Sequence, residues 1–136
     1  MRNMSFALTT AQIIAGSKTV TRRLGWLHAK PGQLVRPVRK CMGLRPGERI
    51  DVLTDPRLIV DVRREPLRRM LDDIEYGFAE CILEGFGEHP DYRWPSAFVD
   101  FFCATHRGCI PDTIITRIAL ALPKRPMTAQ TPEEMG

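Results

Sequence analysis

The spacing of apolar residues changes twice along this chain, and that order constrains the fold more than any other feature. Between residues 20 and 62, apolar and polar residues alternate in short stretches, as they do in β-strands. Between residues 66 and 105, apolar residues recur three and four positions apart, as on one face of a helix. From Ile114 to Leu122 the alternation returns in one long stretch. Strands, then helices, then a closing strand predict an α+β fold, a small α+β barrel.

Length and composition are typical of a single globular domain. The chain has 136 residues, of which 43% are hydrophobic and 26% are charged. We predict one folded domain over residues 4–122 and a disordered tail over residues 123–136, which holds three prolines and no periodicity. No apolar run reaches the length of a membrane span and no signal peptide is recognisable, so we expect a cytoplasmic protein without membrane contact. The sequence does not define an oligomeric state.

Pro-Gly turns and a glycine-capped helix punctuate the first half. Lys30-Pro31-Gly32 and Arg45-Pro46-Gly47 each precede an apolar stretch, which predicts a strand near Leu34 and another near Ile50. Thr9 and Gln12 have the spacing of a capping box, and Gly16 stands where a helix C-cap glycine belongs. We therefore predict a helix of barely two turns between residues 11 and 15.

The helical stretch carries most of the aromatic residues. A helix is predicted to begin at Trp94-Pro95 and to present Phe98, Phe101 and Phe102 on one face. Because helical spacing predicts burial, core packing is favoured over base stacking for these three side chains. A preceding helix is predicted to end at Gly85.

Positive charge is concentrated in the N-terminal third of the chain. Residues 17–50 hold nine basic residues and one acid, a net charge of +8, although the whole chain carries only +4. Such a segment favours a phosphate-bearing partner. The alternative is a solvated basic surface that keeps the protein soluble.

The densest cluster of reactive groups is the stretch Gly16-Ser17-Lys18-Thr19-Val20-Thr21-Arg22-Arg23. A threonine hydroxyl is a poor nucleophile unless a base takes its proton, and a lysine can be that base only where burial or a nearby cation lowers its pKa. Residues three apart on a straight strand point to opposite faces, so Lys18 must lie in the turn after Gly16 to reach Thr21.

This stretch, preceded by a small helix and followed by Lys30-Pro31-Gly32, resembles the motif of the ASCH domain of the PUA-like superfamily. The resemblance covers residues 4 to about 122, including Glu84-Gly85-Phe86 and the final strand. It implies a small PUA-like β-barrel with short helices covering one opening and a cleft beneath the Lys-Thr-x-Thr strand, used for RNA or modified nucleosides. This chain departs from the pattern in its Pro-Gly-Gln turn, where Pro-Gly-Asp is common, and in its double arginine.

The resemblance also implies candidate catalytic residues. Some ASCH proteins are amidohydrolases that remove the acetyl group from N4-acetylcytidine with a lysine, a threonine and a glutamate, and Lys18, Thr21 and Glu84 match these by position. Other members are described as RNA-binding or ribonucleolytic. Without the resemblance, Glu84 is more simply a solvent-facing glutamate at the end of a helix.

Further residues are expected to contact the ligand because they are basic, or aromatic beside basic segments. They are Arg22, Arg23, Trp26, Lys30, Arg36, Arg39 and Lys40. For Trp26 the alternative is ordinary packing. Cys103, His106 and Cys109 have a spacing that resembles a metal site, but a second ligand pair is missing, so buried thiols beside a surface histidine are favoured and no metal or cofactor is expected.

Three functional hypotheses follow. The leading one is a domain that binds RNA or a nucleoside-like ligand in a basic cleft, with Glu84 opposite the motif. The second is an amidohydrolase of acylated cytidine or, less favoured, a ribonuclease. The third is a non-catalytic protein-interaction module.

Overall fold

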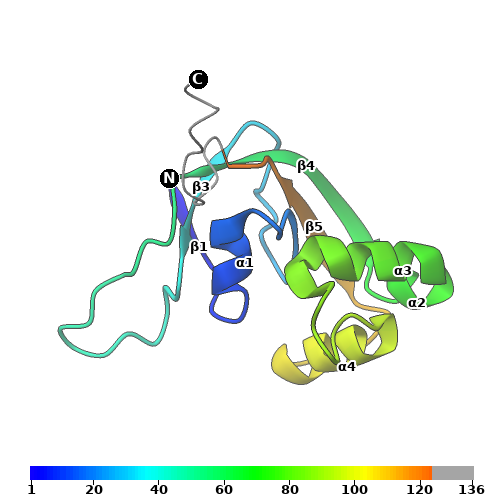
Figure 1. The fold of residues 1–136 in the computed structure, drawn as a ribbon. Helices are drawn as coiled ribbons and strands as arrows, with labels where there is room; N and C mark the ends of the chain where they lie inside the picture. Colours follow the sequence, from blue (N-terminus) through cyan, green and yellow to red (C-terminus); the bar gives the residue numbers. More distant parts are fainter. Residues whose placement is uncertain (124–136) are drawn as a thin grey trace.

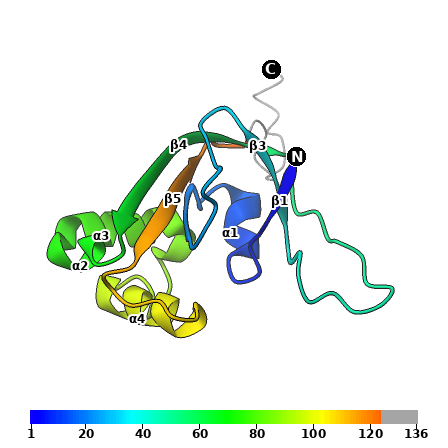
Figure 2. The ribbon, with the colours of Figure 1, turned by 180° about the vertical axis from the view of Figure 1, so that it is seen from behind.

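The structure is a computed structural model that describes residues 1–123 (Figures 1 and 2). The predicted tail lies outside the described residues, apart from Pro123. None of the helices in the described part is long and apolar enough to cross a membrane. The elements, in chain order, are β1 (Arg2–Ser5), α1 (Thr10–Ala15), β2 (Val20–Arg23), β3 (Leu34–Val38), β4 (Arg57–Pro66), α2 (Arg69–Asp72), α3 (Ile74–Cys81), the π-helical turn η1 (Ile82–Phe86), α4 (Pro95–Thr105) and β5 (Ile114–Leu120).

The five strands form one mixed sheet in the order β1-β3-β4-β5-β2. Strands β1 and β3 are parallel, and the other neighbours are antiparallel. A register shift between Ile59 and Asp61 marks an irregularity in the long strand β4. The α+β class is confirmed. Within residues 1–123, β1 and β2 are the two ends of the order and are not paired with each other, so closure into a barrel is not confirmed.

The helices lie on the concave side and at one end of this sheet. Helix α1 sits within the curve of the sheet, and α2 to α4 pack around the end of β4 and the start of β5 (Figures 1 and 2). The predicted stop of α1 is confirmed, because Gly16 adopts φ +84° at its C-cap. The predicted capping box is wrong, since Thr9 makes no side-chain capping bond.

The strand predicted after the second Pro-Gly turn is wrong. Residues 39–56 form a long loop between β3 and β4, with a single isolated bridge between Val38 and Val52. Ile50 and Val52 are 41% and 49% exposed, so their side chains are not packed in an apolar core. An apolar stretch without a surface to pack on does not gain the burial energy that stabilises a strand.

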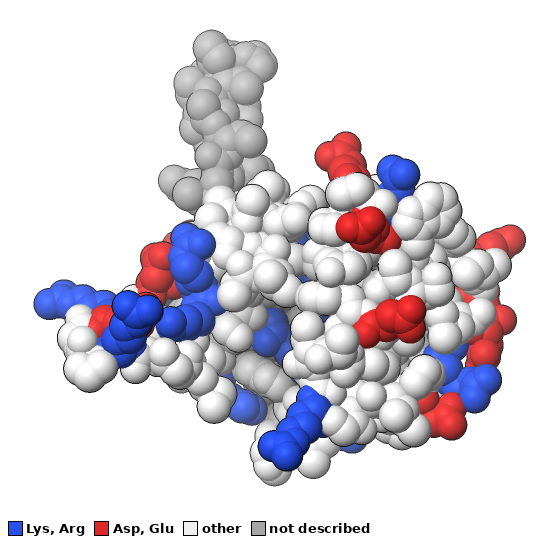
Figure 3. All heavy atoms as spheres, turned by 90° about the horizontal axis from the view of Figure 1, so that it is seen from below, with Lys and Arg blue, Asp and Glu red and all other residues white. Residues whose placement is uncertain are grey.

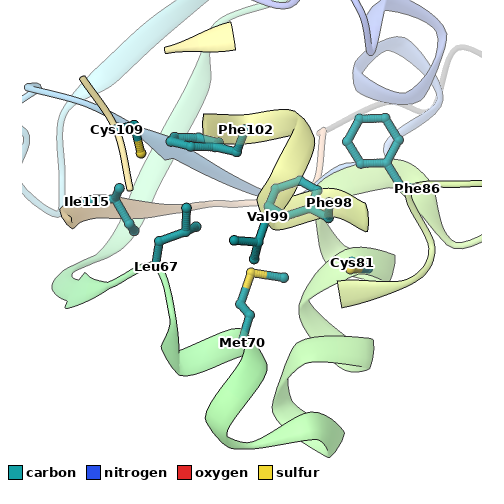
Figure 4. Close-up of a cluster of buried hydrophobic side chains, with 9 residues drawn as sticks. All are labelled: Leu67, Met70, Cys81, Phe86, Phe98, Val99, Phe102, Cys109 and Ile115. Carbon is teal, nitrogen blue, oxygen red and sulfur yellow. The ribbon is translucent and has the colours of Figure 1, made fainter. Parts of the chain in front are cut away.

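Two apolar clusters fill the interior. One lies between α1 and the sheet and includes Met4, Phe6, Ile13, Ile59 and Ile118. The other lies where α2, α3, α4 and β5 meet (Figure 4), and it is formed by Leu67, Met70, Cys81, Phe86, Phe98, Val99, Phe102, Cys109 and Ile115. Phe98 and Phe102 therefore pack in the core, as their spacing predicts, whereas Phe101 is only partly buried and lies outside this cluster.

Gly85 allows η1 to lie very close to α1 and to Lys18. Gly85 has φ +94° within η1, and an added Cβ would lie 3.0 Å from Cβ of Gln12 and 3.2 Å from Cβ of Lys18. The backbone N–H of Thr19 donates to the carbonyl of Leu83 at 2.9 Å. Because η1 approaches this closely, Glu84 lies directly against the Lys-Thr-x-Thr segment.

Candidate functional site

A cavity of about 270 Å³ lies between the Lys-Thr-x-Thr segment, the loop before α1, η1 and the C-terminal half of α4. Its polar wall consists of Lys18, Thr21, Arg22, Arg23 and Glu84. Its apolar wall consists of Phe6, Phe86, Phe98, Phe101 and Phe102, beside His106. On the face shown in Figure 3, Lys and Arg atoms are visible inside a hollow and over the long β3–β4 loop. The cavity thus joins a charged wall to an aromatic one.

Lys18 and Glu84 form the closest charge pair on the cavity wall. Nζ of Lys18 donates to Oε1 of Glu84 at 2.7 Å and to the Glu84 carbonyl at 2.8 Å. Lys18 lies between Gly16 and the start of β2, and its backbone N–H donates to the Gln12 carbonyl at 3.2 Å. Burial lowers the pKa of Lys18 below the ordinary value of 10.5, and the Glu84 charge opposes this effect. Glu84 is 3% exposed, so the solvent-facing interpretation is wrong.

Arg22 donates hydrogen bonds to buried carboxylates. Its Nη2 donates to Oε1 of Glu80 at 2.6 Å, and its Nη1 donates to Oε2 of Glu84 at 3.3 Å. Burial acts to lower the pKa of Arg22, but these two carboxylates outweigh it and raise the pKa. Arg117 donates to both oxygens of Glu80, at 2.5 and 3.0 Å. Arg22 therefore belongs to a buried, hydrogen-bonded charge network.

The network continues away from the cavity. Nη2 of Arg22 also donates to the Tyr76 hydroxyl at 3.2 Å, and that hydroxyl donates to Oε2 of Glu65 at 2.7 Å. Burial, followed by the bond to Glu65, raises the pKa of Tyr76 to about 12. Nε of Arg22 is buried without a hydrogen-bond partner, but both of its terminal nitrogens are bonded to carboxylates. These bonds fix the position of Arg22 and Glu84.

Arg23 has a different environment from Arg22. Its Nε donates to Oγ1 of Thr21 at 3.0 Å, its Nη2 donates to the Ser5 carbonyl at 2.6 Å, and its Cζ lies 4.9 Å from the Phe6 ring centre. Among residues 1–123 it forms no ion pair. Burial lowers its pKa to about 10, so it remains a cation at neutral pH. A guanidinium only donates, so the Thr21 hydroxyl hydrogen is free to point to another acceptor.

His106 lies on the cavity wall, a position that sequence reasoning treated as surface. Its ring stacks on Phe102 with centroids 3.9 Å apart and an interplanar angle of 10°. Its Nδ1 lies 2.8 Å from the Phe102 carbonyl, which places a proton on Nδ1. The sulfurs of Cys103 and Cys109 are 3.7 Å apart, and no metal-binding group of three or more side chains occurs in the described part of the chain.

The other residues predicted to contact the ligand do not line this cavity. Trp26 lines a second cavity, and Lys30 is exposed on a turn. Arg36 is half-buried in β3. Arg39 and Lys40 pair with Asp51 and Glu48 in the exposed loop. The structure thus brings Lys18, Thr21, Arg22, Arg23 and Glu84 together, and leaves the other five elsewhere.

Sequence reasoning missed Glu80, Arg117, Glu65 and Tyr76. Glu80 precedes Glu84 by one helical turn, a spacing that places both carboxylates on one side of a helix. That spacing could have flagged Glu80. No pattern signals Arg117, because it lies beside Arg22 only through the pairing of β5 with β2, and Glu80 contacts both arginines from α3.

Comparisons with known proteins are consistent with this architecture. The structure resembles the crystal structure of a mutant ZmASCH protein from Zymomonas mobilis, with a TM-score of 0.50 and 15% identity, over 98% of this chain and 76% of that one. A protein from Enterococcus faecalis V583, described by the family model DUF984, matches with a TM-score of 0.47 and 15% identity, over 83% and 68% of the two chains. No protein-family model and no curated protein matches the sequence. The chain therefore has an ASCH-like fold.

Proposed function

We propose that the cavity binds RNA or a nucleoside-like ligand, with Arg23 as its anchor. The observation that carries this proposal is the state of Arg23, a cation on the cavity wall that forms no ion pair among the described residues. The Thr21 hydroxyl and the Ser5 carbonyl accept hydrogen bonds from Arg23, but no carboxylate of the described residues lies close enough to pair with its charge. Lys18 and Arg22 already have Glu84 and Glu80. Arg23 is thus the cation best able to hold a phosphate or a carbonyl group.

The opposite wall supports a flat ring as the remaining part of the ligand. Phe101 is partly exposed and provides apolar surface beside the buried Phe86 and Phe102, while Thr21 and Glu84 provide hydrogen-bonding groups. Proteins recognise unpaired bases by this combination, with stacking on aromatic or cationic planes and hydrogen bonds to the base edge. About 270 Å³ accommodates a small ligand, and the cavity opens to solvent so that a chain can continue outside.

Binding is tested with cytidine and a short single-stranded RNA at low and moderate salt. We expect RNA affinity to fall as salt rises, because phosphate contacts release counterions, whereas cytidine affinity stays nearly constant. Arg23→Gln weakens RNA binding by about tenfold or more. The matched control is Arg64→Gln, an exposed arginine of β4 that lines neither cavity. Absence of binding by the native protein would exclude the proposal.

A second candidate, hydrolysis of an acylated cytidine, is favoured by one specific observation. Lys18 and Glu84 lie 2.7 Å apart on the same cavity wall as Thr21, whose oxygen already accepts a bond from Arg23. A guanidinium beside the hydroxyl oxygen stabilises negative charge there, which helps the hydroxyl lose its proton.

The chemistry would proceed in two steps. The first step requires the unprotonated form of Lys18: Thr21 Oγ1 attacks the amide carbonyl and passes its proton to the Lys18 amine, which returns it to the leaving amine as the C–N bond breaks. Water then cleaves the acyl-threonine ester and restores the hydroxyl. Glu84 holds Lys18 in place throughout.

The test is conversion of N4-acetylcytidine to cytidine and acetate, followed by chromatography. Lys18→Ala and Glu84→Gln are expected to abolish turnover, with thermal melting as a check on folding. Glu88→Gln is the control, because Glu88 is exposed shortly after η1 and lines no part of this cavity. Full activity of Glu84→Gln, or an inert native protein, would refute the hydrolase candidate.

A further inference from the structure

We propose that Arg2 and Trp26 form a second subsite that stacks a neighbouring base of single-stranded RNA. The ligand class of this protein would then be a short RNA strand, not a free nucleoside. The inference rests on the proposed binding function of the first cavity, and it adds a site that the motif does not include.

The subsite is built around a cation stacked on an indole ring. Cζ of Arg2 lies 3.9 Å from the Trp26 ring centre. Arg2 is exposed and forms no ion pair or side-chain hydrogen bond among residues 1–123. Trp26 is partly buried against the apolar cluster beside α1 and supports the guanidinium from below. The outer face of the guanidinium therefore remains available, and such a cation-on-indole stack is a surface on which an unpaired base stacks.

The backbone at Trp26 holds the indole in this position. Trp26 has φ +50°, the one non-glycine residue with a positive φ in the described chain, and it follows Gly25 at φ +77°. A bulky residue in this region is a backbone outlier, which the surrounding structure must hold in place. The Thr116 hydroxyl does so in part, because it donates to the Gly25 carbonyl at 2.6 Å.

The surroundings match an anionic, base-bearing ligand. A cavity of about 380 Å³ adjoins the stack, and its lining includes His28, Gln33 and Leu34 but no acidic residue. Gln33 Oε1 accepts a bond from the Lys30 N–H at 3.0 Å, which leaves the amide NH₂ to donate to a base edge. An acidic peptide would match the charge of Arg2 but would make no use of the stacked planes.

Strand β1 contributes lining residues to both cavities. Strand β1 contributes Arg2 to the second cavity and ends at Ser5, which lines the first and accepts a bond from Arg23. Three residues of extended chain span about 10 Å. A single strand of a few nucleotides is therefore long enough to reach from Arg23 to Trp26.

Tryptophan fluorescence tests the subsite directly. The chain has two tryptophans, so Trp94→Phe leaves Trp26 as the sole indole reporter. In this variant we expect a short cytidine-containing RNA to quench Trp26 emission and to bind more tightly than cytidine, which does not quench. Trp26→Ala is expected to weaken RNA binding roughly tenfold, as loss of one stacked base does, and to leave cytidine affinity at the native value.

Trp94→Ala is the matched control, because Trp94 is 47% exposed, packs against Phe78 and lines neither cavity. It should change no affinity. If RNA and cytidine bind equally well and Trp26→Ala alters neither, the subsite is refuted while the first cavity's function stands. If neither ligand binds, both proposals fail. Quenching by polyglutamate equal to that by RNA would also refute the subsite, in favour of an acidic protein partner.

Discussion

Nζ of Lys18 and Oε1 of Glu84 lie 2.7 Å apart although 66 residues separate them in the chain. Both side chains are almost fully buried, at 3% and 4% exposure, on the wall of the first cavity. A buried pair of this kind is stable only while both partners remain. The pair therefore links η1 in the helical part to the Lys-Thr-x-Thr segment.

The titration of Lys18 should be visible in protein stability. Its pKa is below 10.5 in the native state because of burial, so between the two values the unfolded chain binds more protons. Stability associated with Lys18 is therefore reduced below the native pKa and rises as pH approaches 10.5. Urea unfolding of the native protein and of Lys18→Met measures this effect. As pH rises across this range, the free energy of unfolding of the native protein should increase relative to that of the variant. A pH-independent difference would contradict the shift.

Removal of the Glu80 carboxylate should destabilise the fold strongly. Glu80→Gln leaves Arg22 and Arg117 without their shortest acidic contact, and breaking a buried ion pair costs about 3–5 kcal/mol. Asp72→Asn is the control, because its pair with Arg68 is exposed and worth at most about 1 kcal/mol. Chemical denaturation at neutral pH measures both, and equal losses would argue against the network.

The Glu80 carboxylate should also determine how the stability of the protein changes at acidic pH. Burial acts to raise the pKa of Glu80, but hydrogen bonds from Arg117 and the charge of Arg22 outweigh it and lower the pKa below 4.5. Its contribution is therefore complete above 4.5 and is lost as pH falls through the lowered value. The native protein should lose this stability on acidification. Glu80→Gln should lack that part of the pH dependence.

Gly85→Ala tests the close approach of η1 to the motif. The substitution places a side chain at φ +94° and 3.2 Å from Cβ of Lys18, so it must both strain the backbone and displace the lysine. Gly43→Ala is the control, with φ +70° and nothing within 4 Å. We expect about 1–2 kcal/mol of destabilisation from the backbone alone in the control, more in Gly85→Ala, and loss of ligand binding only in Gly85→Ala. Equal effects in unfolding and binding assays would contradict this account.

The basic β3–β4 loop should contribute little to RNA affinity. Arg39 and Lys40 already pair with Asp51 and Glu48, so their charges are partly compensated. Replacing both with glutamine should reduce RNA affinity less than Arg23→Gln does, and should change the slope of log affinity against log salt by less than about 1.4, the value for two lost phosphate contacts. Salt-dependent titration measures this slope. A larger change would show that RNA binds to this loop.

Local patterns predicted the elements whose ends depend on local chemistry. Gly16 ends α1 because it adopts a left-handed conformation, and Pro95 opens α4 because the first turn needs no N–H there. The long alternation after Ile114 became β5, which pairs on both sides. The strand predicted at Ile50 failed for the opposite reason. A strand needs a partner and a surface, and neither is written in its own residues.

The sequence by itself determined the order of strands and helices, and it placed an amine, a hydroxyl and two guanidinium groups within residues 16–23. Only the tertiary structure decided what these groups do. The side chains of Arg22 and Arg23 are neighbours on β2 and point to opposite faces of the strand. Arg22 therefore donates to Glu80 in the interior, while Arg23 donates to Thr21 at the cavity. That division depends on how α3 and η1 pack against β2, and contacts between residues about sixty positions apart leave no periodic signal in the sequence.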